Sequence, residues 1–310
     1  MSKISIIVPT YNEEENIIPL FDAIAEIMRK ELNKYDYEII FIDNRSNDKT
    51  RDRIRWLCGT YHEAKAIFNT KNFGQFNSPY HAMLQSGGDC TILMAADFQD
   101  PVEMIPKFID EWERGYKIVC GIKTTSNENK IMYFLRSCYY KTIKKMSSVE
   151  QIEHFTGFGL YDKSFIDVLR NLNDPTPFLR GIVTELGPQH KEIPYDQPMR
   201  RTGITSNSFY RLYDAAMLSF TSYTKIGLRL ATLGGFILSG LSIMTAIVFL
   251  FLKLIYWDRY PAGTIPVLLA VLVFGSVQLF FIGLLGEYIL SMNTRIMKRP
   301  LVVEEARINF

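Results

Sequence analysis

The sequence lacks several features that would by themselves indicate a class of protein. Its formal net charge is only +2 over 310 residues, so bulk charge does not indicate nucleic-acid binding. It has only four cysteines, whose spacing matches no metal-binding motif: Cys58, Cys90, Cys120 and Cys138. We therefore expect reduced thiols in a cytoplasmic domain. There is no internal repeat, and we expect no signal peptide, because MSKISIIVP has a strand pattern.

Charge is absent altogether from two long stretches in the last third of the chain. Residues 230–252 and 260–286 contain no Asp, Glu, Lys or Arg. As helices these stretches would span roughly 34 Å and 40 Å, more than the hydrocarbon core of a bilayer. A pair of buried core helices is the alternative, but such helices rarely run beyond about 20 residues without charge. We therefore predict two transmembrane helices.

The link between the two apolar stretches is short, which predicts a helical hairpin. Trp257 and Tyr260 in this link suit the membrane interface on the far side. Basic residues flank the hairpin at both of its other ends: Lys225 and Arg229 before it, and Arg295, Lys298 and Arg299 after it. By the positive-inside rule both ends are cytoplasmic. We expect an integral protein of the cell (inner) membrane with its catalytic domain and both termini in the cytoplasm.

The first part of the chain alternates predicted strands with predicted helices. Strands are predicted at 4–8, 38–42, 65–68, 91–96 and 117–121, and helices at 13–32, 48–57, 76–86 and 102–114. Such alternation is typical of an α/β domain with a parallel sheet, in which ligands bind at the C-terminal ends of the strands. We expect an α/β domain at 1–225, a transmembrane part at 226–290 and a cytoplasmic tail at 291–310.

Polar residues follow four of the predicted strands. The segments are PTYNE at 9–13, DNRSND at 43–48, KNFG at 71–74 and DFQD at 97–100. Asn and Asp are ordinary turn and cap residues after a strand, so each segment alone is weak evidence for function. Four such segments at one edge of a sheet favour a binding site.

The same segments resemble a known family. PTYNEEENI, IDNRSNDKT, KNFGQ and ADFQDP, in this order and spacing, resemble the inverting glycosyltransferases of family 2, which have the GT-A fold. Later segments narrow the resemblance to polyprenyl-phosphate glycosyltransferases, relatives of bactoprenol glucosyltransferases and dolichol-phosphate mannosyltransferases: FLRG at 178–181, Pro194-Tyr195, RRTG at 200–203 with Ser206, and GEY at 286–288. The resemblance implies a GT-A (Rossmann-like, mostly parallel) catalytic domain and a C-terminal transmembrane hairpin. It specifies the family and not the sugar.

The resemblance implies a nucleotide-sugar donor and a divalent cation, Mg²⁺ or Mn²⁺, that neutralises the charge growing on the leaving nucleotide. Asp97 matches the family's metal-binding aspartate, and Gln99 matches a side chain that joins it. Asp97 and Asp100 are the implied catalytic residues. The implied nucleotide-sugar-binding residues are Pro9, Tyr11, Asn12, Glu13, Asp43, Asn72 and Gly74.

The implied acceptor is a polyprenyl phosphate in the membrane. Its phosphate oxygen is already ionised near neutral pH, so the enzyme needs cations to hold it rather than a strong general base. The candidate acceptor-binding residues are Arg136, Arg180, Arg200, Arg201 and Ser206, with a solvated surface charge as the alternative for each arginine. The basic amphipathic stretch 130–146 and the apolar stripe of 209–223 predict helices on the membrane surface, with core packing as the alternative.

The sequence departs from the family pattern at three positions. Ala95 replaces the first Asp of the usual D-x-D, Asn44 replaces the second acid after strand two, and Phe158 stands where many relatives carry an acid. A cation held by Asp97, Gln99, water and the donor diphosphate still fits, because Mg²⁺ commonly takes only one or two protein carboxylates. We expect weak binding of the metal alone and strong binding only with donor.

We expect transfer of a single sugar, with UDP-glucose as the best candidate donor, to undecaprenyl phosphate with inversion, for modification of a surface polysaccharide. A processive polysaccharide synthase is one alternative, but the chain lacks the Q-x-x-R-W motif of such enzymes. A catalytically degenerate membrane scaffold is another, suggested by Ala95, but the intact segment 97–100 argues against it. The resemblance also implies a homo-oligomer, and no nucleic-acid partner is expected.

Overall fold

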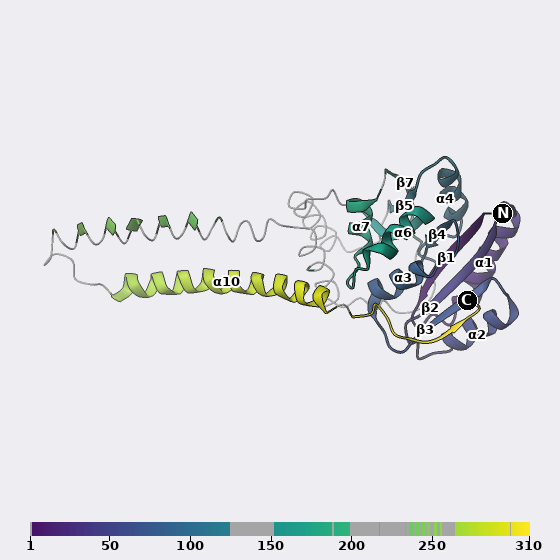
Figure 1. Ribbon diagram of the computed structural model, residues 1–310, viewed down its shortest axis with the longest axis horizontal. Coiled ribbons are helices and arrows are strands. Elements are labelled where there is room, and N and C mark those ends of the chain that lie inside the picture. Colours follow the sequence, from purple (N-terminus) through teal and green to yellow (C-terminus); the bar gives the residue numbers. More distant parts are fainter. Residues whose placement is uncertain are drawn as a thin grey trace.

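The computed structural model describes residues 2–124, 152–187, 189–198, 264–297 and 299–310, together with single residues between 217 and 255. The described strands form one mixed sheet in the order β7-β5-β6-β4-β1-β2-β3-β8. A long helix, α10 (Thr264–Ile296), extends away from the sheet domain (Figure 1). The α/β architecture predicted from the sequence is therefore confirmed.

Four parallel strands make the centre of the sheet: β4 (Cys90–Leu93), β1 (Lys3–Thr10), β2 (Asp36–Asp43) and β3 (Ala64–Asn69). Their side chains alternate between two hydrophobic cores. Ile4, Ile6 and Val8 point into one core and Ile7 into the other. Because both faces are covered, the strands are continuous apolar runs, as is usual in parallel sheets.

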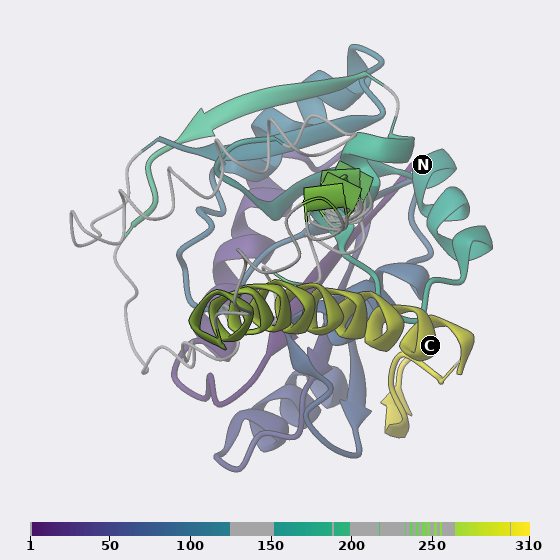
Figure 2. The same cartoon turned by 90° about the vertical axis from the view of Figure 1, so that its left-hand side faces the viewer.

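Helices cover both faces of the sheet (Figure 2). The first core also contains apolar residues of α1 (Ile17–Glu31), α2 (Thr50–Thr60) and α4 (Met104–Glu113). The second contains residues of α3 (Gly74–Leu84), α6 (Lys163–Leu172) and α7 (Leu179–Leu186). The predicted strand at 117–121 is β5 (Ile118–Lys123). The predicted helix at 13–32 begins later, at Ile17, because residues 12–16 belong to the loop after β1.

Three strands of the sheet were not predicted from the sequence. β6 (Phe155–Asp162) lies antiparallel between β4 and β5, and β7 (His190–Tyr195) lies parallel beside β5. The signal of β6 is weak because its sequence, FTGFGLYD, contains two glycines. Gly159 is needed there, since a Cβ at this position would lie 2.3 Å from the backbone oxygen of Val119. The sheet is therefore mixed, with antiparallel as well as parallel strand pairs.

The C-terminal tail supplies the third missed strand. β8 (Glu304–Ile308) pairs antiparallel with β3 and forms one edge of the sheet. Just before it, the backbone N–H of Thr70 donates to the carbonyl of Val303 at 3.0 Å. Just after it, the Asn309 amide donates to the carbonyls of Cys58 at 2.7 Å and Ala64 at 2.9 Å. The tail is thus fastened to the sheet from Val303 to Asn309.

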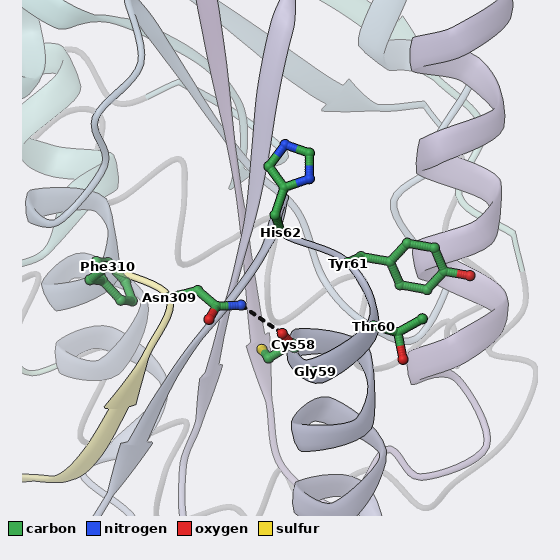
Figure 3. A pocket seen from close by; sticks show the side chains of 7 residues that line it. All are labelled: Cys58, Gly59, Thr60, Tyr61, His62, Asn309 and Phe310. Atoms are coloured by element: carbon green, nitrogen blue, oxygen red, sulfur yellow. Dashed lines mark hydrogen bonds between the residues drawn. The ribbon is translucent and has the colours of Figure 1, made fainter.

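A shallow hollow of ≈ 500 Å³ lies between the C-terminal end of α2 and the last residues of the chain. Figure 3 shows its lining residues, which are Cys58, Gly59, Thr60, Tyr61, His62, Asn309 and Phe310. It borders the start of β3, whereas parallel α/β sheets bind ligands at the opposite, C-terminal strand ends. Cys58, Cys90 and Cys120 are buried free thiols, as expected, and Cys138 lies outside the described residues.

The second predicted membrane span is helical, because α10 covers it from Thr264 onward. Within the described part of the chain, its segment Val277–Thr294 is long and apolar enough to cross a bilayer, and large side chains such as Leu279 and Phe280 are exposed on it. Twelve of the 23 residues of the first predicted span, 230–252, lie outside the described residues. The two-helix hairpin therefore stays a prediction.

Candidate active site

Each of the four central parallel strands is followed by a residue with a left-handed backbone. Their φ angles are 55° at Asn12, 67° at Arg45, 89° at Gly74 and 60° at Phe98. Glycine adopts this conformation without strain, but for other residues it costs about 1–2 kcal/mol. Strained residues cluster at functional sites when the surrounding contacts hold them in place. The predicted convergence of polar strand-end segments on one edge of the sheet is confirmed.

The loops after β1 and β2 are tied together by hydrogen bonds. The Asn12 backbone N–H donates to Ser46 Oγ at 2.9 Å, and Asn12 Oδ1 accepts from the Asn47 backbone at 2.9 Å. The Glu13 backbone donates to Thr50 Oγ1 at 2.8 Å, and the Glu13 side chain is buried. Tyr11 and Asn12 are exposed, and Pro9 is half-buried. Of the residues predicted to bind the nucleotide after β1, Tyr11 and Asn12 are therefore the most accessible.

Asp43 lies at the C-terminal end of β2 with no exposed side-chain surface. Its carboxylate accepts from the backbone N–H groups of Arg45 at 3.1 Å and Ser46 at 3.2 Å, and Arg51 Nε lies 3.3 Å from Oδ2. Burial raises the pKa of Asp43, and the hydrogen bonds from Ser46 and the charge of Arg51 oppose that rise. Asp43 thus shapes the loop 44–48, and its predicted contact with a nucleotide stays a prediction.

Asn44 joins the loop after β2 to the loop after β3. Its Oδ1 accepts from the Phe73 backbone at 2.9 Å and from Asn69 Nδ2 at 3.2 Å, while its Nδ2 donates to the Gly74 carbonyl at 3.1 Å. An aspartate at this position would have no donor for that carbonyl. The asparagine that replaces the family's second acid therefore has a structural role. Asn72 Oδ1 accepts from the Gly74 backbone at 2.9 Å, which places both predicted donor-binding residues in this loop.

The two acids of the segment DFQD have different environments. Asp97 is half-buried, and its Oδ1 accepts from the Gln99 backbone at 3.1 Å. Asp100 is buried; its Oδ2 accepts from the Ala95 backbone at 2.8 Å and its Oδ1 from Tyr195 Oη at 3.1 Å. Burial raises the pKa of Asp100 to about 6. Asp100 therefore braces the loop from inside, while Asp97 and Gln99 lie nearer its surface.

The oxygen donors in this loop suit a hard divalent cation. Asp97 offers a carboxylate and Gln99 an amide oxygen, which are ligand types that Mg²⁺ and Mn²⁺ accept. No group of three or more His, Cys, Asp or Glu side chains gathers at metal-binding distance in the parts of the chain that the structure describes. Two protein ligands leave most of an octahedral shell to water and phosphate. The residues therefore fit a cation that binds together with a donor diphosphate.

Phe158 is a core residue in this chain. It is 2 % exposed, and its ring packs edge-on against Phe108 at 4.9 Å and Tyr195 at 5.3 Å between centroids. A carboxylate at this position would be buried among aromatic rings and would cost several kcal/mol if charged. Its contact with Tyr195, which donates to Asp100, nevertheless connects Phe158 to the loop of Asp97.

Arg180 is the one candidate acceptor-binding residue within the described ranges. It lies near the start of α7, half-buried, with its guanidinium 5.0 Å from the Phe178 ring centroid. Its Nη1 donates to the Phe155 carbonyl at the start of β6 at 3.5 Å. Arg136, Arg200, Arg201 and Ser206, with the segments 130–146 and 209–223, lie outside the described residues apart from Met217.

Three residues that shape the site were not predicted from the sequence. Arg51 is the charge partner of Asp43, and Glu305 of β8 contacts Arg51. Tyr195 occurs in a segment that carried the family resemblance, but no role was assigned to it. The dipeptide Pro194-Tyr195 could have indicated Tyr195. No local signal could indicate Glu305, because 254 residues separate it from Arg51.

Comparison with known proteins decides the family. A family model described as "Glycosyl transferase family 2" matches residues 5–169, which include all four strand-end loops. The chain belongs to glycosyl transferase family 2. It is therefore a glycosyltransferase, and its mixed α/β sheet has the GT-A-like arrangement that the resemblance implied.

Several curated proteins resemble this family 2 chain along nearly its whole length. It is 32% identical to the putative glycosyltransferase CsbB of Bacillus subtilis, over 98% of this chain and 92% of that protein. It is 29% identical to the SfII prophage-derived bactoprenol glucosyl transferase of Shigella flexneri, over 96% of each chain. The solved glucosyl-3-phosphoglycerate synthase of Mycobacterium tuberculosis aligns with a TM-score of 0.47 and 16% identity, over 71% of this chain and 76% of that chain.

Proposed function

We propose that this glycosyltransferase transfers a single sugar from a nucleotide-sugar to a polyprenyl phosphate, with inversion, at the cytoplasmic face of the cell membrane. The observation that carries the proposal is that a left-handed residue follows each of the four central parallel strands, with Asp97 in the loop after β4, in a chain of family 2. A relative named bactoprenol glucosyl transferase, matched over 96% of this chain, supports a glucosyl group and an undecaprenyl-type acceptor. We therefore take UDP-glucose as the donor and modification of a surface polysaccharide as the purpose.

At the donor side, Asp97 and Gln99 would hold Mg²⁺ or Mn²⁺ against the diphosphate. The cation would neutralise negative charge on the departing nucleotide. Tyr11 and Asn12 after β1, and Asn72 with Gly74 after β3, are proposed to contact the nucleotide-sugar. Asp100 keeps this loop in place through the Ala95 backbone, so its contribution to catalysis would be positional.

At the acceptor side, a phosphate oxygen acts as the nucleophile. The second phosphate pKa is about 6, so the oxygen is ionised at neutral pH and needs no strong general base. The problem is instead to hold two anions close together, which requires cations. Arg180 supplies one on α7, and Arg136, Arg200 and Arg201 with Ser206 are proposed to supply the rest.

The position of the tail supports a membrane-spanning hairpin, because a chain that returns to its starting side must cross the membrane an even number of times. β8 pairs with β3, so the chain after α10 is on the same side of the membrane as the catalytic sheet. If α10 crosses the bilayer, a second crossing must precede it, and the uncharged residues 230–252 are long enough to supply it. We therefore propose an integral membrane protein with the parts 1–225, 226–290 and 291–310 and with both termini cytoplasmic.

The test is a transfer assay with the full chain in detergent. Undecaprenyl phosphate is incubated with a panel of radiolabelled nucleotide-sugars, and the lipid product is extracted and its sugars are counted. We expect a monoglycosylated lipid from UDP-glucose, formed only when Mg²⁺ or Mn²⁺ is present and abolished by a chelator. A product with several sugars would favour a processive synthase, and no product from any donor would favour a scaffold.

Asp97→Asn tests the site within the same assay. We expect the rate to fall at least about 100-fold, because the only carboxylate proposed to hold the cation is lost. Asp22→Asn is the matched control, since Asp22 is an exposed residue of α1, and its rate should be unchanged. An Asp97 variant as active as the control would contradict the proposed site.

A further inference from the structure

We propose that the C-terminal strand completes the donor site and that Glu305 is a positioning residue, which holds Arg45 and Arg51 beside Asp43. The inference rests on the proposed function, because it takes the strand-end loops as the place where the nucleotide-sugar binds. It assigns the tail a part in binding the donor, although the tail follows the membrane helix in the sequence.

Glu305 bridges two arginines from the opposite end of the chain. Its Oε2 accepts from Arg45 Nη1 at 2.8 Å and from Arg51 Nη2 at 2.9 Å. Arg45 is the left-handed residue in the loop after β2, and Arg51 lies in the first turn of α2. One carboxylate of β8 therefore fixes both the loop and the helix that follows it.

Arg51 connects Glu305 to the buried Asp43. Its side chain is only 12% exposed, its Nε lies 3.3 Å from Asp43 Oδ2, and its guanidinium lies 5.0 Å from the Phe68 ring centroid. Among the described residues, Arg51 Nε has no partner with hydrogen-bond geometry. Its Nη2 bond to Glu305 is therefore a directed contact that keeps the guanidinium in place. Without Glu305, we expect Arg51 to turn toward water and leave the Asp43 carboxylate less well paired.

The contact also bears on the neighbouring loop. Asp43 accepts from the Arg45 and Ser46 backbones, and Ser46 Oγ accepts from the Asn12 backbone. The loop 44–48 is thus held by Glu305 through Arg45 and by the Asn12 backbone through Ser46. A loop loosened by loss of Glu305 would cost binding free energy when the donor orders it again.

Glu304 offers a matched control on the same strand. It pairs with His81 at 2.6 Å and with Arg307 at 2.6 Å. These partners differ from Arg45 and Arg51, which pair with Glu305. Glu304→Gln therefore removes one carboxylate charge from β8 and weakens its attachment to α3, while leaving the pairs of Glu305 with Arg45 and Arg51 intact. Any effect of Glu305→Gln that comes only from a weaker β8 should occur in both variants.

The experiment compares the full-length wild type, Glu305→Gln and Glu304→Gln in detergent. Hydrogen–deuterium exchange without nucleotide reports the protection of residues 43–51, and the transfer assay with UDP-glucose and undecaprenyl phosphate gives the donor KM and kcat. For Glu305→Gln we expect faster exchange in 43–51 and a donor KM raised about three- to tenfold, the range for losing charge-assisted hydrogen bonds at a partly exposed site. We expect kcat to change less than KM, and Glu304→Gln to leave both readouts as in the wild type.

Three results would overturn the proposal: unchanged exchange and KM in Glu305→Gln, equal changes in both variants, or a lower donor KM in Glu305→Gln. The last would mean that Glu305 competes with donor phosphates for Arg45. If the wild type transfers sugar from no donor, the proposed function fails. The exchange data alone then decide whether Glu305 positions Arg45 and Arg51. Faster exchange of 43–51 in Glu305→Gln but not in Glu304→Gln supports it, and equal exchange overturns it.

Discussion

At the scale of single residues, burial and hydrogen bonds decide what each side chain of the candidate site does, even where the residue departs from the family motif. Asp97 and Asp100 are three residues apart, yet Asp100 is buried against the Ala95 backbone and Tyr195, while Asp97 is half-buried beside Gln99. Ala95 lacks the acid of the usual motif, but its backbone N–H is the group that Asp100 holds. The loop can therefore keep its shape without the missing carboxylate.

Asn44→Asp, which restores the family's usual acid, should destabilise this protein. The variant loses the hydrogen bond from Asn44 Nδ2 to the Gly74 carbonyl and places a carboxylate oxygen against that carbonyl. We expect the free energy of unfolding to fall by about 1–3 kcal/mol, the cost of leaving a buried polar group unsatisfied. The measurement is the thermal unfolding midpoint in detergent.

The control for this prediction is Asn47→Asp in the same loop. The Asn47 side chain is exposed, and only its backbone N–H bonds to Asn12, so the midpoint should stay close to that of the wild type. Equal midpoints for Asn44→Asp and Asn47→Asp would show that the link between the loops contributes no stability.

At the scale of elements, a buried carboxylate ties together the strands at the end of the sheet opposite the site. Glu38 of β2 accepts from Ser5 Oγ of β1 at 2.6 Å and from the Gly87 backbone at 2.8 Å. Lys3 Nζ and Lys65 Nζ lie 2.5 Å and 2.8 Å from its Oε2. Burial by itself would raise the pKa of Glu38, but the hydrogen bonds from Lys3, Lys65, Ser5 and Gly87 outweigh burial and lower it to about 2.

This pKa predicts a loss of stability in acid. The folded-state pKa lies below the ordinary glutamate value of 4.5, so the stabilisation is present above about pH 4.5 and is lost as the pH falls toward 2. A shift of this size corresponds to about 3 kcal/mol. We expect the gap in unfolding midpoint between wild type and Glu38→Gln to be wide at pH 7 and to narrow below about pH 4.5.

The control is Glu26→Gln on the exposed surface of α1, where Glu26 pairs with Lys30 four residues away. Pairs of this kind contribute little, so its gap from the wild type should be small at every pH. A Glu38 gap that stays constant from pH 7 to pH 3 would show that Glu38 is not the group responsible for acid sensitivity.

The elements were predictable where their pattern is local. Continuous apolar runs indicated β1 to β5, and apolar spacing indicated α1, because burial on one or both faces leaves a mark in the sequence. The helices α2, α3 and α4 were expected only because they fit the gaps between those strands. β6 was missed because its glycines allow close strand contact and weaken the strand pattern. β8 was missed because its sequence, EEARI, is mostly polar, as suits an exposed edge strand.

At the scale of the whole molecule, the chain returns to its first domain after α10. β8 borders β3, so the end of α10 is joined to the catalytic sheet through residues 297–303. The tail therefore limits how the sheet domain can move relative to α10. In the proposed topology the acceptor would approach from the membrane toward loops that the tail helps to hold.

The proposed topology predicts which positions a membrane-impermeant maleimide can reach in intact cells. In a Cys138→Ser background, Asp258→Cys in the link between the two spans should be labelled from outside, because the hairpin places it on the far face. Phe310→Cys, at the exposed C-terminus, should be labelled only after lysis. The described native cysteines are buried and give little background. Labelling of both positions, or of neither, in intact cells would contradict the hairpin.

The sequence by itself determined the family, the α/β class, the strand ends that form the candidate site and the long uncharged run that lies mostly in α10. These properties are local, since each depends on a short pattern of burial, turn chemistry or charge. Only the tertiary structure decided that Asp100 braces its loop, that Asn44 replaces an acid for a structural reason, and that Glu305 reaches Arg45 and Arg51. Those contacts join side chains from separate elements, and their partners are set by strand order and register, which no single stretch of sequence contains.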